Sequence, residues 1–313
     1  MKKIDKTKFQ SILLQGFSSL SIFLILPISI IVLDYESLAI WYILTGLYFI
    51  GVIFDIGFSH IFTIRIKYEL ENRKSKNLFI AISSCRLINL IISFLVCVIL
   101  SLFVFIYFNS LDFNENDYIF YLINSSIIIF SISLDFIYIY KTCVLKATEK
   151  VEKTYLSIFI QRFSQLIFLI LFLLFFNQNL FCFTFSYLFS IFIKNFYIFL
   201  EYKKINIIKY KLKFSEKFLI LKEIIIPSLR LGVVNLGTFL IIRSNLYVVN
   251  FFLGFKIGAS FAILQQIAGA ASGLAYVIYN SDFPVFLRHI VKKMKVKMFI
   301  LRTIRNSLLI YLL

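Results

Sequence analysis

Residues 36–76 read ESLAIWYILTGLYFIGVIFDIGFSHIFTIRIKYELENRKSK. The part from 37 to 64 is almost wholly apolar and exceeds the about 20 helical residues that cross a bilayer. Asp55 interrupts it, and because a carboxylate in hydrocarbon costs about 2.5–3.5 kcal/mol, we expect Asp55 to face protein or water. A basic loop follows, with Arg65, Lys67, Arg73, Lys74 and Lys76. The stretch therefore predicts a membrane helix that carries an acid and ends at the cytoplasmic face.

The composition extends this prediction to the whole chain. The 313 residues are 60% hydrophobic, whereas soluble domains are about 45–50% apolar. The net charge of +17 lies between apolar runs and is not gathered on one face with base-stacking aromatics, so we expect no nucleic-acid partner. An all-α, polytopic membrane protein is therefore predicted.

Eight full transmembrane helices and the start of a ninth near residue 298 are expected. Their predicted ranges are 9–33, 37–64, 78–108, 118–140, 155–176, 180–200, 224–252 and 257–285. Every second connecting loop is rich in lysine and arginine, and the N-terminal MKKIDKTK is basic too. Because basic loops stay in the cytoplasm, this alternation predicts a cytoplasmic N-terminus.

The connecting loops also suggest a division into two lobes. Segment 201–223 mixes lysines with apolar residues, which predicts an amphipathic linker on the cytoplasmic surface. It separates a six-helix lobe, 1–200, from an incomplete second lobe, 224–313. The external loops are short and leave no room for a domain outside the membrane.

Six charged residues fall inside the predicted spans, about 8–15 Å from the cytoplasmic end at a rise of 1.5 Å per residue. They are Asp55, Arg86, Asp135, Arg162, Lys194 and Arg230. Six helices with charges at similar depth predict a water-filled, net-positive vestibule. Arginine pairs phosphate oxygens two at a time, so an anionic phosphate headgroup is the expected ligand.

Other interpretations of these charges remain open. Lys194, Arg162 and Arg230 can extend to lipid headgroups, and Arg243 can extend outward in the same way. Arg86 can form a structural pair with Asp55. The two acids, Asp55 and Asp135, are too short to reach an interface, and we expect them to pair with bases or to carry a proton.

No pattern for catalysis is present. The four cysteines form no CxxC pair, and His60 and His289 stand in no metal motif. A phosphate-binding loop of the Walker type is absent as well. We therefore expect no enzymatic activity, no cofactor and no metal.

Several short segments together resemble the polysaccharide flippases of the O-antigen (Wzx) type, within the multidrug/oligosaccharidyl-lipid/polysaccharide exporter superfamily. They are AIWYIL, FDIGFSHIF, VLKATEKVEKTYL, IIRSNLYVVNFFLGFKIGASFAILQQI and DFPVF, spread over residues 39–286. The order of the set is more specific than any one segment.

The resemblance implies 12 spans in two six-helix lobes, a central cationic cavity and alternating access. It implies that an undecaprenyl-pyrophosphate-linked oligosaccharide is flipped across the bacterial inner membrane, driven by a proton or sodium gradient. Membrane lipids, a polysaccharide polymerase and a chain-length regulator are the other expected partners. Arg86, Arg162 and Arg230, assisted by Lys194, would hold the pyrophosphate, while Asp55 or Asp135 would carry the coupling ion or balance the bases.

The chain departs from this pattern in two ways. Members of the family often carry an acid near the position of Arg243, and none is present here. Spans ten to twelve are also absent, so we expect a truncated product or a fragment. Two rival functions are a multidrug exporter, which calls for an acidic cavity, and a membrane glycosyltransferase or O-antigen polymerase, which calls for a sizeable external loop.

Overall fold

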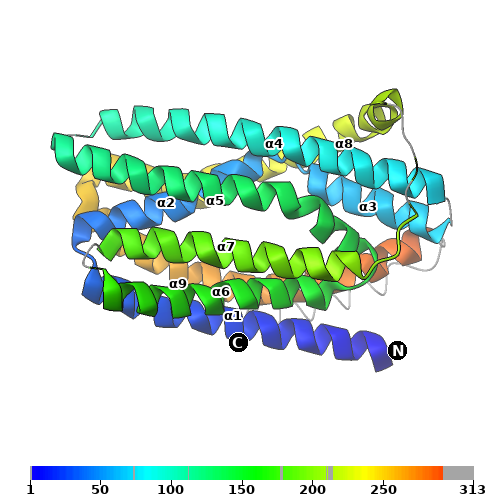
Figure 1. Cartoon of the computed structure of the whole chain (residues 1–313), viewed down its shortest axis with the longest axis horizontal. Coiled ribbons are helices and arrows are strands. Elements are labelled where there is room, and N and C mark those ends of the chain that lie inside the picture. Colours follow the sequence, from blue (N-terminus) through cyan, green and yellow to red (C-terminus); the bar gives the residue numbers. More distant parts are fainter. Residues whose placement is uncertain are drawn as a thin grey trace.

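The computed structural model describes residues 2–72, 75–111, 113–176, 179–208, 210 and 214–291. Within these ranges every regular element is an α-helix, and the long helices run roughly parallel to one another (Figure 1). The helices are α1 (Lys2–Val32), α2 (Tyr35–Phe54), α3 (Phe58–Glu71), α4 (Ser75–Asn109), α5 (Glu115–Ala147), α6 (Val151–Phe175), α7 (Asn179–Lys203), α8 (Phe214–Ile242) and α9 (Ser244–Val291).

Seven stretches of the described chain are helical, long and apolar enough to cross a membrane. They are Phe9–Val32, Tyr35–Phe54, Ser75–Asn109, Glu115–Ala147, Val151–Phe175, Leu180–Lys203 and Ile220–Ala270. Large apolar side chains such as Ile31, Phe94 and Phe252 are exposed along the outer faces, as lipid-facing side chains are. The all-α fold is confirmed, and the chain is a multi-pass membrane protein.

The last of these stretches folds back on itself at Gly254. This glycine has φ 80° and ψ 170°, which breaks the helical path inside α9. On either side of it, the Gln265 side chain donates a hydrogen bond to the carbonyl of Ile242, and Gly258 lies against the side chain of Asn250. Ranges 224–252 and 257–285 are therefore the two arms of a hairpin. The ninth apolar run, from residue 298, lies outside the described residues.

The prediction of one unbroken helix over 37–64 is wrong. α2 ends at Phe54 and α3 begins at Phe58, and Ile56 and Gly57 between them have positive φ angles of 48° and 75°. A three-residue interruption hardly changes the mean hydropathy of so apolar a stretch. Hydropathy alone therefore does not reveal the break, although the acid and the glycine of FDIG mark its position.

α8 crosses this break in close contact. A Cβ atom at Gly57 would lie 2.5 Å from Cβ of Leu231, and one at Gly232 would overlap Cγ2 of Ile56. An ion pair of 3.0 Å between Arg65 of α3 and Glu223 of α8 holds the same two elements together farther along. Glycine at 57 and 232 thus permits a backbone approach that no larger residue allows.

Gly232→Ala is expected to destabilise the protein by about 1–3 kcal/mol, because the added methyl group overpacks the contact with Ile56. Gly237→Ala is the matched control on the same helix, since a Cβ there meets nothing within 4 Å. The measurement is the thermal unfolding midpoint of each purified variant in detergent. Equal midpoints for the two variants would contradict the close crossing.

One end of the bundle collects the basic connections. The N-terminal end of α1, α3 and the first part of α8 lie there (Figure 1). We call it the basic end because α3, the α5–α6 connection and the end of α7 lie there, and these segments carry Lys67, Lys146, Lys150, Lys203 and Lys204. Lys67 joins α3 to the α5–α6 connection through Glu149, at 2.9 Å.

The linker predicted at 201–223 is not a separate helix. Residues 201–203 complete α7, residues 205–208 are not helical, and α8 begins at Phe214. The apolar residues after Phe214 belong to a longer helix that continues into the bundle. The division into lobes at this segment therefore stays a prediction, without the surface helix.

Candidate functional site

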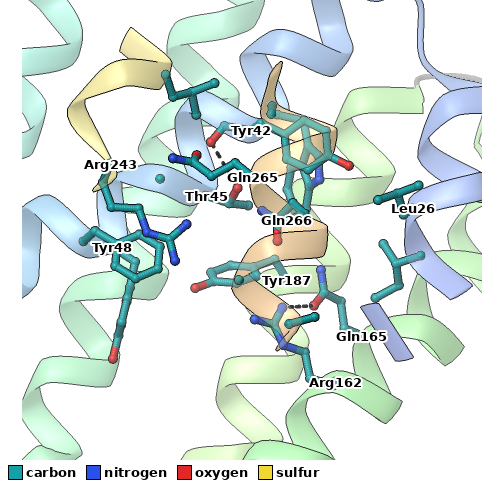
Figure 2. A pocket seen from close by; sticks show the side chains of 18 of the residues that line it. Leu26, Tyr42, Thr45, Tyr48, Arg162, Gln165, Tyr187, Arg243, Gln265 and Gln266 are labelled. Carbon is teal, nitrogen blue, oxygen red and sulfur yellow. Dashed lines mark hydrogen bonds between the residues drawn. The ribbon is translucent and has the colours of Figure 1, made fainter. Parts of the chain in front are cut away.

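A cavity of about 360 Å³ lies among α1, α2, α5, α6, α7 and α9 (Figure 2). Its charged side chains are Asp135, Arg162, Lys194 and Arg243. Amide side chains also line it, namely Gln15, Gln161, Gln165, Gln265 and Gln266. The aromatic lining consists of Trp41, Tyr42, Tyr48, Phe49, Tyr187 and Tyr247. Among the described lining residues, three cations stand against one carboxylate, so this part of the lining is net positive.

Arg162 reaches the cavity from α6. Ile158, Gln161, Arg162 and Gln165 follow one another at helical spacing, which puts them on one side of the helix. Nη1 of Arg162 donates to Oε1 of Gln165 at 3.4 Å, and Tyr187 of α7 lies beside this pair (Figure 2). Within the described chain, no carboxylate is within 4 Å of the Arg162 guanidinium. Its charge is therefore not balanced by an acid of the described chain.

Arg243 enters the cavity from a different side. It is the single residue between α8 and α9, and its guanidinium lies 3.8 Å from the ring centroid of Phe49 in α2. Nη2 of Arg243 also lies 3.6 Å from the point where a Cβ of Gly269 would stand. The interpretation in which Arg243 extends outward to lipid is therefore wrong. As for Arg162, no described carboxylate forms an ion pair with it.

The third cation of the cavity has a partner. Nζ of Lys194 in α7 lies 2.6 and 2.7 Å from the two carboxylate oxygens of Asp135 in α5. Both side chains are largely buried, and such a pair is neutral overall. The unbalanced charge of the cavity is consequently carried by the two arginines.

Asp55 lies outside the cavity and is bonded to the start of α3. Its carboxylate accepts hydrogen bonds from the backbone N–H of Ser59, at 3.2 and 3.3 Å, and from the Ser59 hydroxyl at 2.7 Å. It therefore caps the first turn of α3, where free N–H groups favour an acid. Among the described residues it forms no ion pair with Arg86. The interpretation of Asp55 and Arg86 as a structural ion pair is therefore wrong.

The shared vestibule of six charges is also corrected. The lining of the cavity includes Asp135, Arg162 and Lys194, but not Asp55, Arg86 or Arg230. Arg86 on α4 and Arg230 on α8 are both exposed. Depth along a helix places a residue in the membrane but does not say which face of the helix carries it. The binding roles of Arg162 and Lys194 stay predictions.

Several lining residues were missed by reasoning from charges. The amides of α6 and α9 are uncharged, so a search for buried charges passes over them. A usable signal is present in the sequence, because Gln161 and Gln165 stand four residues apart and Gln265 and Gln266 are adjacent inside largely apolar helices. The tyrosines, by contrast, carry no distinguishing pattern among the chain's 18 tyrosines and 39 phenylalanines.

Comparisons of the chain with models of protein families, with curated proteins and with solved structures find no match.

Proposed function

We propose that this protein is a flippase that moves a lipid-linked oligosaccharide, carried on undecaprenyl pyrophosphate, across the bacterial inner membrane by alternating access. The orientation that follows from the basic loops puts the basic end in the cytoplasm. The cargo would then enter the cavity from the leaflet at that end and leave on the opposite side.

One observation carries this proposal: two arginines that have no carboxylate partner among the described residues enter one cavity from different parts of the chain, α6 and the α8–α9 connection. A guanidinium pairs two phosphate oxygens at once, and a pyrophosphate offers oxygens to two such groups. The five glutamine side chains supply both donors and acceptors for sugar hydroxyls. The tyrosines add hydroxyl groups and apolar ring faces. Phosphate, sugar and cavity are thus chemically complementary.

The Asp135–Lys194 pair offers a way to couple transport to an ion. A carboxylate that exchanges a lysine for a proton or sodium ion changes the charge of the cavity by one unit. Pro27 in α1 and Pro227 in α8 remove backbone hydrogen bonds where these helices would have to bend. Both features suit a cavity that opens alternately to the two sides.

The two rival functions fit the cavity less well. An exporter of cationic drugs calls for an acidic cavity, and the one carboxylate among the described lining residues is already paired with Lys194. A membrane glycosyltransferase or polymerase calls for a catalytic group facing the sugar. The described residues that line the cavity include neither a histidine nor an unpaired carboxylate for that purpose.

Deletion of the gene in its source organism tests the proposal. We expect the surface polysaccharide to be lost and lipid-linked oligosaccharide to accumulate in the inner leaflet, and a plasmid copy of the gene should reverse both effects. A polymerase deletion would instead leave single repeat units on the outer surface. Unchanged polysaccharide together with altered drug sensitivity would replace the flippase with an exporter.

A further inference from the structure

A second group of cations lies at the basic end, outside the cavity. It consists of Arg86 on α4, Lys141 on α5 and Lys203 on α7, together with the rings of Tyr138 and Phe199. We call it the cationic–aromatic cluster. None of its members lines the cavity, and the function proposed above does not use it.

Lys141 is the centre of the cluster. Its Nζ lies 3.7 Å from the ring centroid of Tyr138, 4.6 Å from that of Phe199 and 5.6 Å from that of Tyr140. Only 6% of the residue is exposed, and within the described chain no carboxylate pairs with it. Aromatic faces offset part of the cost of burying an ammonium group, about 0.5–2 kcal/mol each, but they do not neutralise it.

Two more cations lie near Lys141. Arg86 lies within electrostatic reach of Lys141 and of the hydroxyls of Tyr140 and Tyr202. Nζ of Lys203 lies 4.3 Å from the centroid of the Phe199 ring, which Lys141 also contacts. The acid nearest in sequence, Glu201, is bonded to Lys204 at 2.5 Å. Like charges brought together in this way are disfavoured unless an anion lies among them.

Simple extension of the side chains toward the interface does not explain the arrangement. A lysine that extends in this way keeps its ammonium group in water, whereas the ammonium of Lys141 is held among rings. Lys141 lies six residues before the end of α5, which is about 9 Å along the helix, and Lys203 ends α7. A bundle that crosses the bilayer along its long helices would place this position in the headgroup and glycerol region of the leaflet at the basic end.

We propose that the cationic–aromatic cluster binds the phosphate of an anionic phospholipid headgroup from that leaflet. Basic sites between membrane helices bind such headgroups, and Lys141 and Lys203 at the Phe199 ring, with Arg86 nearby on α4, provide the charge. The exposed guanidinium of Arg86 would donate hydrogen bonds to the phosphate oxygens. The buried ammonium of Lys141 would balance the phosphate charge from the protein side. The lipid would join α4, α5 and α7 from the outside.

Native mass spectrometry of the purified full-length chain tests the proposal, with phosphatidylglycerol, phosphatidylethanolamine and phosphatidylcholine titrated separately. We expect phosphatidylglycerol to be retained preferentially, and Arg86→Gln/Lys141→Gln to weaken its retention by about tenfold, since two charge-assisted contacts are lost. The charge-keeping Arg86→Lys/Lys141→Arg should stay within about threefold of the unmodified protein. Lys222→Gln removes an exposed lysine of α8 outside the cluster and should change nothing.

If the variant with Lys141→Gln does not fold, Arg86→Gln is tested alone, because Arg86 is exposed and its replacement should not affect folding. This single variant should weaken the retention of phosphatidylglycerol several-fold. Gel filtration and circular dichroism check each variant's fold. Equal retention of phosphatidylglycerol by the neutralised variant and Lys222→Gln would overturn the proposal. So would equal retention of the three lipids, or displacement of phosphatidylglycerol by millimolar inorganic phosphate, which would assign the cluster to a soluble anion.

Discussion

Replacing Arg162 and Arg243 together by glutamine is expected to lower polysaccharide export by at least about tenfold, and each single replacement by several-fold. The two guanidiniums carry the unbalanced charge of the cavity, and a charge-assisted hydrogen bond to phosphate contributes about 1.5–3 kcal/mol. Glutamine keeps hydrogen-bonding capacity but removes the charge. The measurement is surface polysaccharide in a deletion strain that carries each variant at matched expression.

Two controls make this prediction specific. Arg230→Gln removes an exposed arginine of α8 that does not line the cavity, and export should be unchanged. Lysine in place of each cavity arginine keeps the charge but loses the planar fork, so an intermediate rate is expected. Normal export by the double glutamine variant, or an equal loss in Arg230→Gln, would contradict the role of the cavity arginines.

Lys194→Gln is expected to destabilise the protein by about 3 kcal/mol, because it leaves the Asp135 carboxylate buried without its base. Asp135→Asn should destabilise by a similar amount for the converse reason. The double variant should recover much of the loss, since two neutral amides at this distance can bond to each other. Thermal unfolding in detergent gives the four midpoints of the cycle.

The same double variant separates the two roles proposed for Asp135. If the carboxylate only balances Lys194, the double variant exports polymer at a near-normal rate. If it carries the coupling ion, the double variant is stable but inactive. Strictly additive effects of the two single replacements would instead contradict the ion pair itself.

Much of the fold could be predicted because apolar runs dominate it. The ranges expected for α4, α5, α6 and α7 lie inside the helices or pass their ends by one residue. An apolar run in the bilayer stays helical because its backbone N–H and C=O groups can find hydrogen-bond partners only within the helix. The predicted ranges are shorter than the helices because α5 and α7 continue past the apolar stretch into charged residues such as Lys146 and Lys203. Charged helical turns outside hydrocarbon leave no hydropathy signal.

The site could be predicted only in part, for a geometric reason. Asp135, Arg162 and Lys194 were found because a charge in an apolar helix is conspicuous. Arg86 and Arg230 are also charges in apolar helices, but they lie on helix faces that are turned away from the cavity. Counting residues from the end of a helix gives the depth of a side chain and not the face that carries it. Arg243 reaches the cavity because the hairpin at Gly254 brings α9 back beside it, a long-range contact that no local pattern encodes.

Trp41 provides the most direct test of the central claim, that the cavity receives a pyrophosphate-linked headgroup. It is the chain's single tryptophan, it lines the cavity, and its ring lies 6.4 Å from that of Tyr187. Undecaprenyl pyrophosphate added to the protein in detergent is expected to produce a saturable change in Trp41 fluorescence, which neutral undecaprenol does not produce and which Arg162→Gln/Arg243→Gln abolishes. An equal change with undecaprenol, or an unaltered response in the double variant, would contradict the account.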